Sequence, residues 1–321
     1  MACFEAQVAG FVVVQVPLVQ SLGGMATRMA AAGASSAVLP DGRRVRCVSK
    51  RDVPFLYREI FQEKCYLKHG VDLRPGDTVF DVGANIGLFA LFAAERCGSH
   101  GKVYAFEPLP ETFDALRYNV ETFCSGKQMG HVVCNQVGVS DGKQSDAKFT
   151  YYASAAGWSS MEPNEEEVRE AMNTYLDNAL VSSSSLEDTW LAKAGTALAR
   201  YAPRWLYSAA KIAFINSMLH SKQTTTCRLV SVSEAMKMYE VQNVDLLKVD
   251  VERAELGVLM GVGLDEWPKI RQCALEVHDL DGERLRQVCA LLQDVARFPS
   301  VEVEQDVDLK GTKLYNVYCC R

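Results

Sequence analysis

The sequence Asp77-Thr-Val-Phe-Asp-Val-Gly-Ala-Asn-Ile-Gly-Leu88 predicts a buried strand that turns on Gly83 and Gly87 into a helix. Thr78 to Val82 is a short, mostly apolar run of the kind found in buried strands. The apolar residues that follow from Leu88 indicate a helix. Such a turn lets a ligand approach the backbone closely, near the positive end of the helix dipole.

A second strand, Val103 to Phe106, ends in Glu107, about 20 positions after the turn, where dinucleotide-type folds place an acid that binds ribose hydroxyls. The turn lacks the G-x-G-x-x-G pattern, however, and it contains Asn85, which tolerates a left-handed backbone. Asp81 would repel a phosphate at this position, which favours a ligand with a positive centre. S-adenosylmethionine, a nucleoside with a sulfonium cation, fits this description, and a NAD-dependent oxidoreductase is the weaker alternative.

The composition is that of a globular protein, with 321 residues, 48% hydrophobic and 23% charged. A formal net charge of −6 argues against a non-specific nucleic-acid surface. The 11 cysteines are scattered, without C-x-x-C pairs, which indicates reduced thiols in a cytoplasmic setting and no cysteine metal site. Ala9 to Val19 is too short to span a membrane and lacks the basic start of a secretory signal. We therefore expect no membrane contact; the sequence leaves the oligomeric state open.

The alternation of strands and helices runs over residues 38–161 and 223–321. Within it we expect a third strand from His131 to Val139 and helices over Pro54 to Leu67 and Arg284 to Val295. Ser233 is the predicted N-cap of a short helix that ends at Tyr239.

Residues 162–222 interrupt the alternation and predict three helices, the last from Arg204 to Leu219. We interpret this insertion as a lid over an apolar acceptor site, and a helical hairpin packed on its neighbours is the alternative. Residues 1–37 are interpreted as an N-terminal extension.

Four motifs together resemble the FkbM-type family of S-adenosylmethionine-dependent methyltransferases, over a region from about Val38 to the end without most of the insertion. They are Asp81-Val-Gly-Ala-Asn-Ile-Gly87, Phe106-Glu-Pro108 with Asn119-Val120, Leu247-Lys-Val-Asp-Val-Glu252 with Ala254-Glu255, and Leu275-Glu-Val-His278.

The resemblance implies an α/β, Rossmann-like class I methyltransferase fold, with a doubly wound, seven-stranded, mostly parallel sheet whose last strand is antiparallel. It implies O-methylation of a hydroxyl (or carboxyl) on a small-molecule or natural-product acceptor, apolar or carrier-bound. The family usually has glycine at the position of Arg253, where a positive φ would cost an arginine on the order of 1 kcal/mol. Implied cofactor contacts are Asp81, Gly83, Ala84, Asn85, Gly87, Glu107 and Asp250.

Methyl transfer needs the acceptor oxygen in line with the methyl group, and a hydroxyl acceptor benefits from a base. The catalytic candidates Asp250, Glu276 and His278 follow strands whose carboxyl ends bind ligands in open α/β sheets, and Glu252 is a further candidate. We predict that His278 is the base, because its ordinary pKa is nearest to neutral, and that Asp250 positions the acceptor. The alternatives are a surface histidine, a divalent metal held by these side chains, and a protein that binds S-adenosylmethionine without turnover.

Overall fold

The computed structural model describes residues 35–50, 52–125, 128–152, 166, 169–170, 172–174, 176–177, 201–220, 222–279, 282–306 and 313–321. The chain divides into the units Met1–Gly33 and Ala34–Arg321, and all described residues belong to the second. The predicted N-terminal extension therefore lies almost entirely outside the described residues. Most of the first two predicted helices of the insertion also lies outside the described residues.

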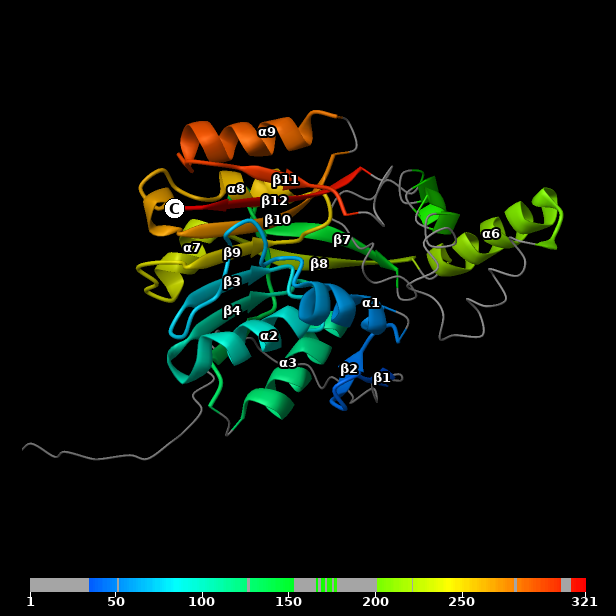
Figure 1. Cartoon of the computed structure of the whole chain (residues 1–321), viewed down its shortest axis with the longest axis horizontal. Helices are drawn as coiled ribbons and strands as arrows, with labels where there is room; N and C mark the ends of the chain where they lie inside the picture. The colour runs from blue at the N-terminus through cyan, green and yellow to red at the C-terminus, as the bar shows by residue number, and fades with distance from the viewer. Residues whose placement is uncertain are drawn as a thin grey trace, which may run out of the picture. The chain divides into compact units, whose positions relative to one another are not determined.

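A seven-stranded sheet with the order β11-β12-β10-β9-β3-β4-β5 forms the centre of the fold (Figure 1). The strands from β5 to β10 in this order run parallel, and β12 is antiparallel to both β10 and β11. This arrangement confirms the predicted doubly wound, mostly parallel sheet. The strands are β3 (Thr78–Val82), β4 (Lys102–Phe106), β5 (His131–Asn135), β9 (Leu246–Val249), β10 (Gln272–His278), β11 (Glu302–Glu304) and β12 (Leu314–Cys320).

Helices cover both faces of this sheet (Figure 1). Successive side chains of a strand point to opposite faces, so Val79 packs into one core and Phe80 into the other. Burial on both faces explains why β3 is apolar along most of its length. One layer holds α1 (Val53–Tyr57), the π-helix η1 (Arg58–Glu63), α2 (Leu88–Cys97) and α3 (Pro110–Cys124). The other holds α7 (Val232–Met238), α8 (Glu255–Met260), α9 (Arg284–Ala290) and the π-helix η5 (Leu291–Val295). The short helices η2 (Gly98–His100) and η4 (Trp267–Lys269) lie in connections.

Two smaller sheets accompany the central one. A hairpin pairs β1 (Ser35–Val38) with β2 (Arg44–Cys47), as the Pro-Asp-Gly turn predicts. A second sheet has the order β6-β8-β7. Its strands are β6 (Gly138–Ser140), β7 (Asp146–Tyr152) and β8 (Lys222–Ser231), and β8 directly follows the region of α6 (Arg204–Leu219), the third predicted helix of the insertion.

Three local predictions need correction. The predicted strand His131 to Val139 is two strands, because Asn135 O accepts from Glu107 N at 3.0 Å where β4 ends, and the chain then pairs with β8 instead. Helix α7 is capped by Ser231 rather than Ser233, since Ser231 and Glu234 form a capping box. The helices predicted over Pro54 to Leu67 and Arg284 to Val295 each change from α to π geometry partway.

The cysteines within the described ranges are free thiols, and most of them are buried. Burial raises the pKa of several of these thiols, to about 12 for Cys97 and Cys134. Among the helices that the structure describes, none combines the length and the apolar character needed to cross a membrane.

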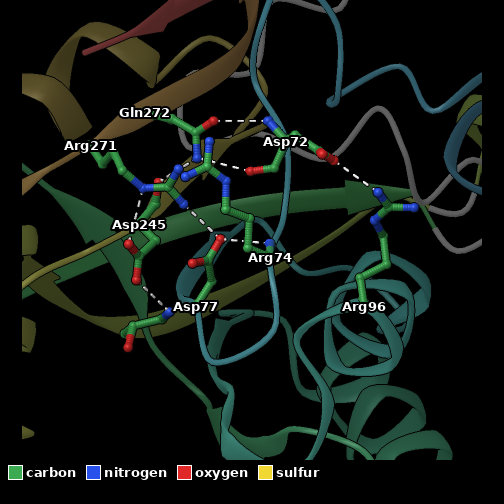
Figure 2. Close-up of polar contacts among 8 residues, drawn as sticks. Asp72, Arg74, Asp77, Arg96, Asp245, Arg271 and Gln272 are labelled. Carbon is green, nitrogen blue, oxygen red and sulfur yellow. Dashed lines mark hydrogen bonds and ion pairs between the residues drawn. The ribbon is translucent and has the colours of Figure 1, made fainter.

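Polar side chains join the amino ends of β3, β9 and β10 (Figure 2). Arg271 donates to Asp77 Oδ2 at 2.6 Å and to Asp245 Oδ1 at 3.1 Å. Asp245 Oδ2 in turn accepts from the backbone N–H of Thr78 at 2.8 Å. Gln272 Nε2 donates to the carbonyl of Asp245 at 2.9 Å. This network holds the amino ends of the three strands together. The predicted site lies at their opposite, carboxyl ends.

Replacing Arg271 by methionine removes the guanidinium that two carboxylates share. We expect Arg271→Met to lower the free energy of unfolding by about 1–3 kcal/mol, because partly buried acceptors lose a charged donor. Urea denaturation measures this change. The control is Arg117→Met, which removes an exposed pair with Asp114 at 3.5 Å and is expected to cost less than about 0.5 kcal/mol. Equal changes in the free energy of unfolding for the two substitutions would show that the network does not stabilise the fold.

Candidate active site

The loop after β3 has a left-handed backbone conformation at three positions, and glycine and asparagine are the residue types that adopt it most readily. Gly83, Asn85 and Gly87 have φ values of +78°, +51° and +88°, in the left-handed region. A Cβ on Gly83 would lie 1.7 Å from the carbonyl oxygen of Asp250, and one on Gly87 would lie 2.5 Å from Leu116 Cδ1. The glycines therefore permit a close approach of the loop to β9 and to α3.

Glu107 lies against this loop, as the spacing predicts. Its carboxylate accepts from Asn85 N and from Leu109 N, each at 3.0 Å, and the residue is only 6% exposed. Burial raises the pKa of Glu107 to about 7, although both backbone hydrogen bonds act to lower it. Each carboxylate oxygen keeps a lone pair that can accept a hydroxyl proton. The backbone N–H of buried Ala84 donates to Phe106 O at 3.0 Å and so also joins the loop to β4.

Asp81 is fully buried, and its predicted role as a cofactor contact stays a prediction. Lys248 Nζ lies 3.1 Å from Asp81 Oδ1, so the carboxylate is paired and does not present a free negative charge to the loop. Lys248 also donates to Gly83 O at 2.8 Å. Burial acts to lower the pKa of Lys248, but Asp81 and Asp250 outweigh it and raise the pKa overall. Asp81 thus acts on the loop through Lys248.

Asp250 follows the end of β9 and faces the same region. Its Oδ2 accepts from the Tyr66 hydroxyl at 2.8 Å and lies 3.6 Å from Lys248 Nζ. Tyr66 packs edge-on against Phe89 in α2, with ring centroids 5.1 Å apart. No sequence pattern indicates Tyr66, because it is separated from Asp250 by 184 residues.

Glu276 lies on β10 and is partly buried. In the part of the chain that the structure describes, its carboxyl makes no hydrogen bond or ion pair. Burial, followed by the nearby Asp250, raises the pKa of Glu276 to about 8, against the lowering effect of His278. Glu59 in η1 has a pKa raised well above the ordinary value by burial, then by Glu276 and Asp250. Three carboxyls from separate parts of the sequence therefore come together here.

The ring of His278 lies between two carboxylates, and its predicted role as general base stays a prediction. The residue is 5% exposed, so it is not a surface histidine. Its Nδ1 lies 2.8 Å from Glu255 Oε1, and its Nε2 lies 2.9 Å from Glu252 Oε2. Burial acts to lower the pKa of His278, but the two carboxylates raise it well above the ordinary value. An imidazolium that donates both N–H groups has no nitrogen available to accept a proton.

The described residues contain no group of three or more His, Cys, Asp or Glu side chains arranged to hold a metal ion. A cavity of about 610 Å³ lies at the amino ends of the strands, lined by Thr78, Asp245, Arg271 and others. The predicted site residues lie instead at the carboxyl ends.

The residues at the carboxyl ends of β3, β4 and β9 fit an adenosyl ligand. Glu107 lies against the Gly83 loop and provides acceptors for two vicinal hydroxyls. Among the described residues, neither carboxylate oxygen of the buried Asp81 accepts a hydrogen bond of good geometry, although Oδ1 forms an ion pair with Lys248. Asp250 is the partly exposed carboxylate at the same edge, where it can face a cation.

Protonation of Glu107 should weaken nucleoside binding, because a carboxylate accepts two hydroxyl protons and a carboxylic acid does not. We expect the affinity for S-adenosylhomocysteine to fall as the pH is lowered through about 7. Glu107→Gln should bind about tenfold to a hundredfold more weakly at pH 8 and should lose this pH dependence. Titration calorimetry from about pH 6 to about pH 8, one unit on either side of the raised pKa, measures both effects. Unchanged affinity in Glu107→Gln would remove Glu107 from the ribose site.

Comparisons with known proteins identify the family of the chain. The family model for the methyltransferase FkbM domain matches residues 81–178 and 136–298. The 31-O-demethyl-FK506 methyltransferase FkbM of Streptomyces tacrolimicus is 36% identical over 281 residues, 87% of this chain and 94% of that protein. The AMB antimetabolite synthetase AmbE of Pseudomonas aeruginosa is 31% identical over 88% of this chain, but the match is 12% of that protein.

Among solved structures, the methyltransferase FkbM from Methylobacillus flagellatus has 10% identity and a TM-score of 0.44, over 83% of this chain and 50% of that one. A S-adenosylmethionine-dependent O-methyltransferase from Thermotoga maritima has 11% identity and a TM-score of 0.42, over 90% and 77%. The family match and the Streptomyces relative together settle the family. The chain belongs to the FkbM family of S-adenosylmethionine-dependent methyltransferases.

Proposed function

We propose that this methyltransferase methylates a hydroxyl oxygen of a small natural-product acceptor. The name of the Streptomyces relative, a 31-O-demethyl-FK506 methyltransferase, supports an oxygen acceptor. The observation that carries the proposal is Glu276, a carboxyl with a pKa raised to about 8 at the carboxyl edge of the sheet, with Asp250 nearby. A hydroxyl acceptor benefits from a proton acceptor at such a place, and a pKa near the working pH suits a general base.

S-adenosylmethionine supplies a methyl group activated by a sulfonium cation. The chain itself must hold the acceptor oxygen in line and remove its proton. In our proposal Asp250, which is fixed by Tyr66 and Lys248, positions the hydroxyl. Glu276 then takes the proton in place of His278. His278 is held by two carboxylates and remains charged.

The charge around Glu276 favours a hydroxyl over a carboxyl acceptor. Burial, and then the nearby Glu276 and Asp250, raise the pKa of Glu59, so the three carboxyls lie close together. A carboxylate acceptor would add a further negative charge among them, which like-charge repulsion and poor solvation disfavour. A neutral hydroxyl carries no such cost.

We also propose that the insertion covers an apolar part of the acceptor. Helix α6 supports this, because Trp205 and Ile212 are 70% and 55% exposed. Exposed apolar side chains of this size on one helix are typical of surfaces that bind a ligand or another segment. The extent of the lid, residues 162–222, is the one that the sequence predicts.

Glu276→Gln tests the proposed base. Methyl transfer from labelled S-adenosylmethionine is measured on a panel that contains 31-O-demethyl-FK506, smaller alcohols and matched carboxylic acids. We expect turnover of the best hydroxyl acceptor to fall by roughly 10²–10⁴-fold. Affinity for S-adenosylhomocysteine should stay within about twofold. The wild-type rate should rise with pH through about 8, because the base must be deprotonated, and the variant should lose this step.

Glu302→Gln, an exposed substitution on the edge strand β11, is the control and should keep the wild-type rate and pH profile. Full activity of Glu276→Gln would contradict the proposed base. Labelling of the carboxylic acids alone would contradict the hydroxyl acceptor. Loss of wild-type activity with a chelator would favour the metal alternative.

A further inference from the structure

We infer that His278 is a positioning residue whose two ring contacts hold a strained turn after β9, and through it the backbone of Asp250 against the cofactor loop. The inference rests on the proposed site only for the ligand that this loop binds. It replaces the role of proton acceptor that the sequence suggests for His278 with a mechanical one.

The turn is strained at two consecutive residues. Glu252 has a φ of +40° and Arg253 a φ of +78°. Residues with a Cβ rarely adopt the left-handed region, and they do so only where surrounding contacts impose it. Arg253 therefore has the positive φ at which we expect an arginine to be strained where the family usually has glycine. Some contacts must therefore compensate for the strain.

His278 lies at the centre of these contacts. Its Nε2 is 2.9 Å from Glu252 Oε2, on the first strained residue. Its Nδ1 is 2.8 Å from Glu255 Oε1, and the same oxygen accepts from Arg253 N at 2.7 Å. Both strained residues are therefore held by one group of three side chains. Arg284 completes the group, because its guanidinium donates to Arg253 O.

These side chains are held firmly enough to transmit position. Glu255 is fully buried and His278 is 5% exposed, so neither can exchange its partner for water. The imidazole comes from β10, whereas both carboxylates belong to the turn and to the start of α8. His278 therefore fixes the turn to a strand of the central sheet and not merely to itself.

The consequence for the site follows from the neighbouring residue. Asp250 directly precedes the turn, and its carbonyl oxygen is so close to Gly83 that a Cβ there would lie at 1.7 Å. A small rotation of the turn would move this carbonyl against the loop whose Asn85 N–H donates to Glu107. It would also move the Asp250 carboxylate away from the Tyr66 hydroxyl, which donates a hydrogen bond to Asp250 Oδ2 at 2.8 Å.

Relieving the strain at Arg253, the residue of the turn with the larger positive φ, should reduce the need for His278, and this gives a test by rescue. His278→Gln, Arg253→Gly and the double variant are compared by titration with S-adenosylhomocysteine. We expect His278→Gln to bind about tenfold more weakly and Arg253→Gly to bind like the wild type. The double variant should return to within about threefold of the wild type, because glycine adopts the positive φ without strain. His131→Gln, at an exposed position at the start of β5, is the control and should change nothing.

Amide hydrogen exchange tests the same inference without any ligand. The amides of Arg253 and Ala254, bonded at 2.7 and 3.3 Å, should exchange faster in His278→Gln and be protected again in the double variant. Wild-type affinity and exchange in His278→Gln would overturn the inference. So would a double variant no better than His278→Gln, or one that fails to fold, since His278 would then serve packing or chemistry. Failure of the wild type to bind S-adenosylhomocysteine would contradict the cofactor site alone and leave the exchange result to decide.

Discussion

The arrangement of this site depends on the contacts that the buried ammonium of Lys248 makes with two carboxylates and one backbone carbonyl. The ammonium lies 3.1 Å from Asp81 Oδ1 and 3.6 Å from Asp250 Oδ2, and it donates to Gly83 O at 2.8 Å. A buried charge is strongly unfavourable unless it is paired and hydrogen-bonded. The ends of β3 and β9 must therefore stay at one separation. At that separation the backbone of Asp250 leaves no room for a side chain on Gly83, which explains the residue type at the turn.

The same principle divides the acidic residues of the site into two groups. Lys248 and His278 are two buried cations, and each is shared between two carboxylates. The paired acids are fixed in place, which suits them for positioning loops and ligands. Glu276 has no such partner among the residues that the structure describes, and its pKa is raised by burial and by Asp250. A carboxyl of this kind can change its proton within the physiological range, so we assign it the chemistry and assign His278 the support of the turn.

Local patterns in the sequence predicted much of this. Strand β3 and helix α6 have the predicted bounds, because each depends on a short run of apolar residues and on its flanking turn. The pairing of the glycine loop with Glu107 was also predictable, since it follows from spacing within one βαβ unit. Tyr66 and Glu59 were not, because they reach the site from an N-terminal segment with no motif. The surroundings of His278 were not predictable for a related reason, as its pKa depends on carboxylates that only the folded chain brings together.

A double-mutant cycle between Asp81 and Lys248, measured as the free energy of unfolding, tests the central interaction most directly. Lys248→Met leaves a buried carboxylate without its partner, so we expect a loss of about 3–5 kcal/mol. Adding Asp81→Asn to that variant should recover about 1–3 kcal/mol, because the unpaired charge is removed. Strictly additive losses in the double variant would contradict the account, since they would mean that the strand ends are held by packing and not by the shared ammonium.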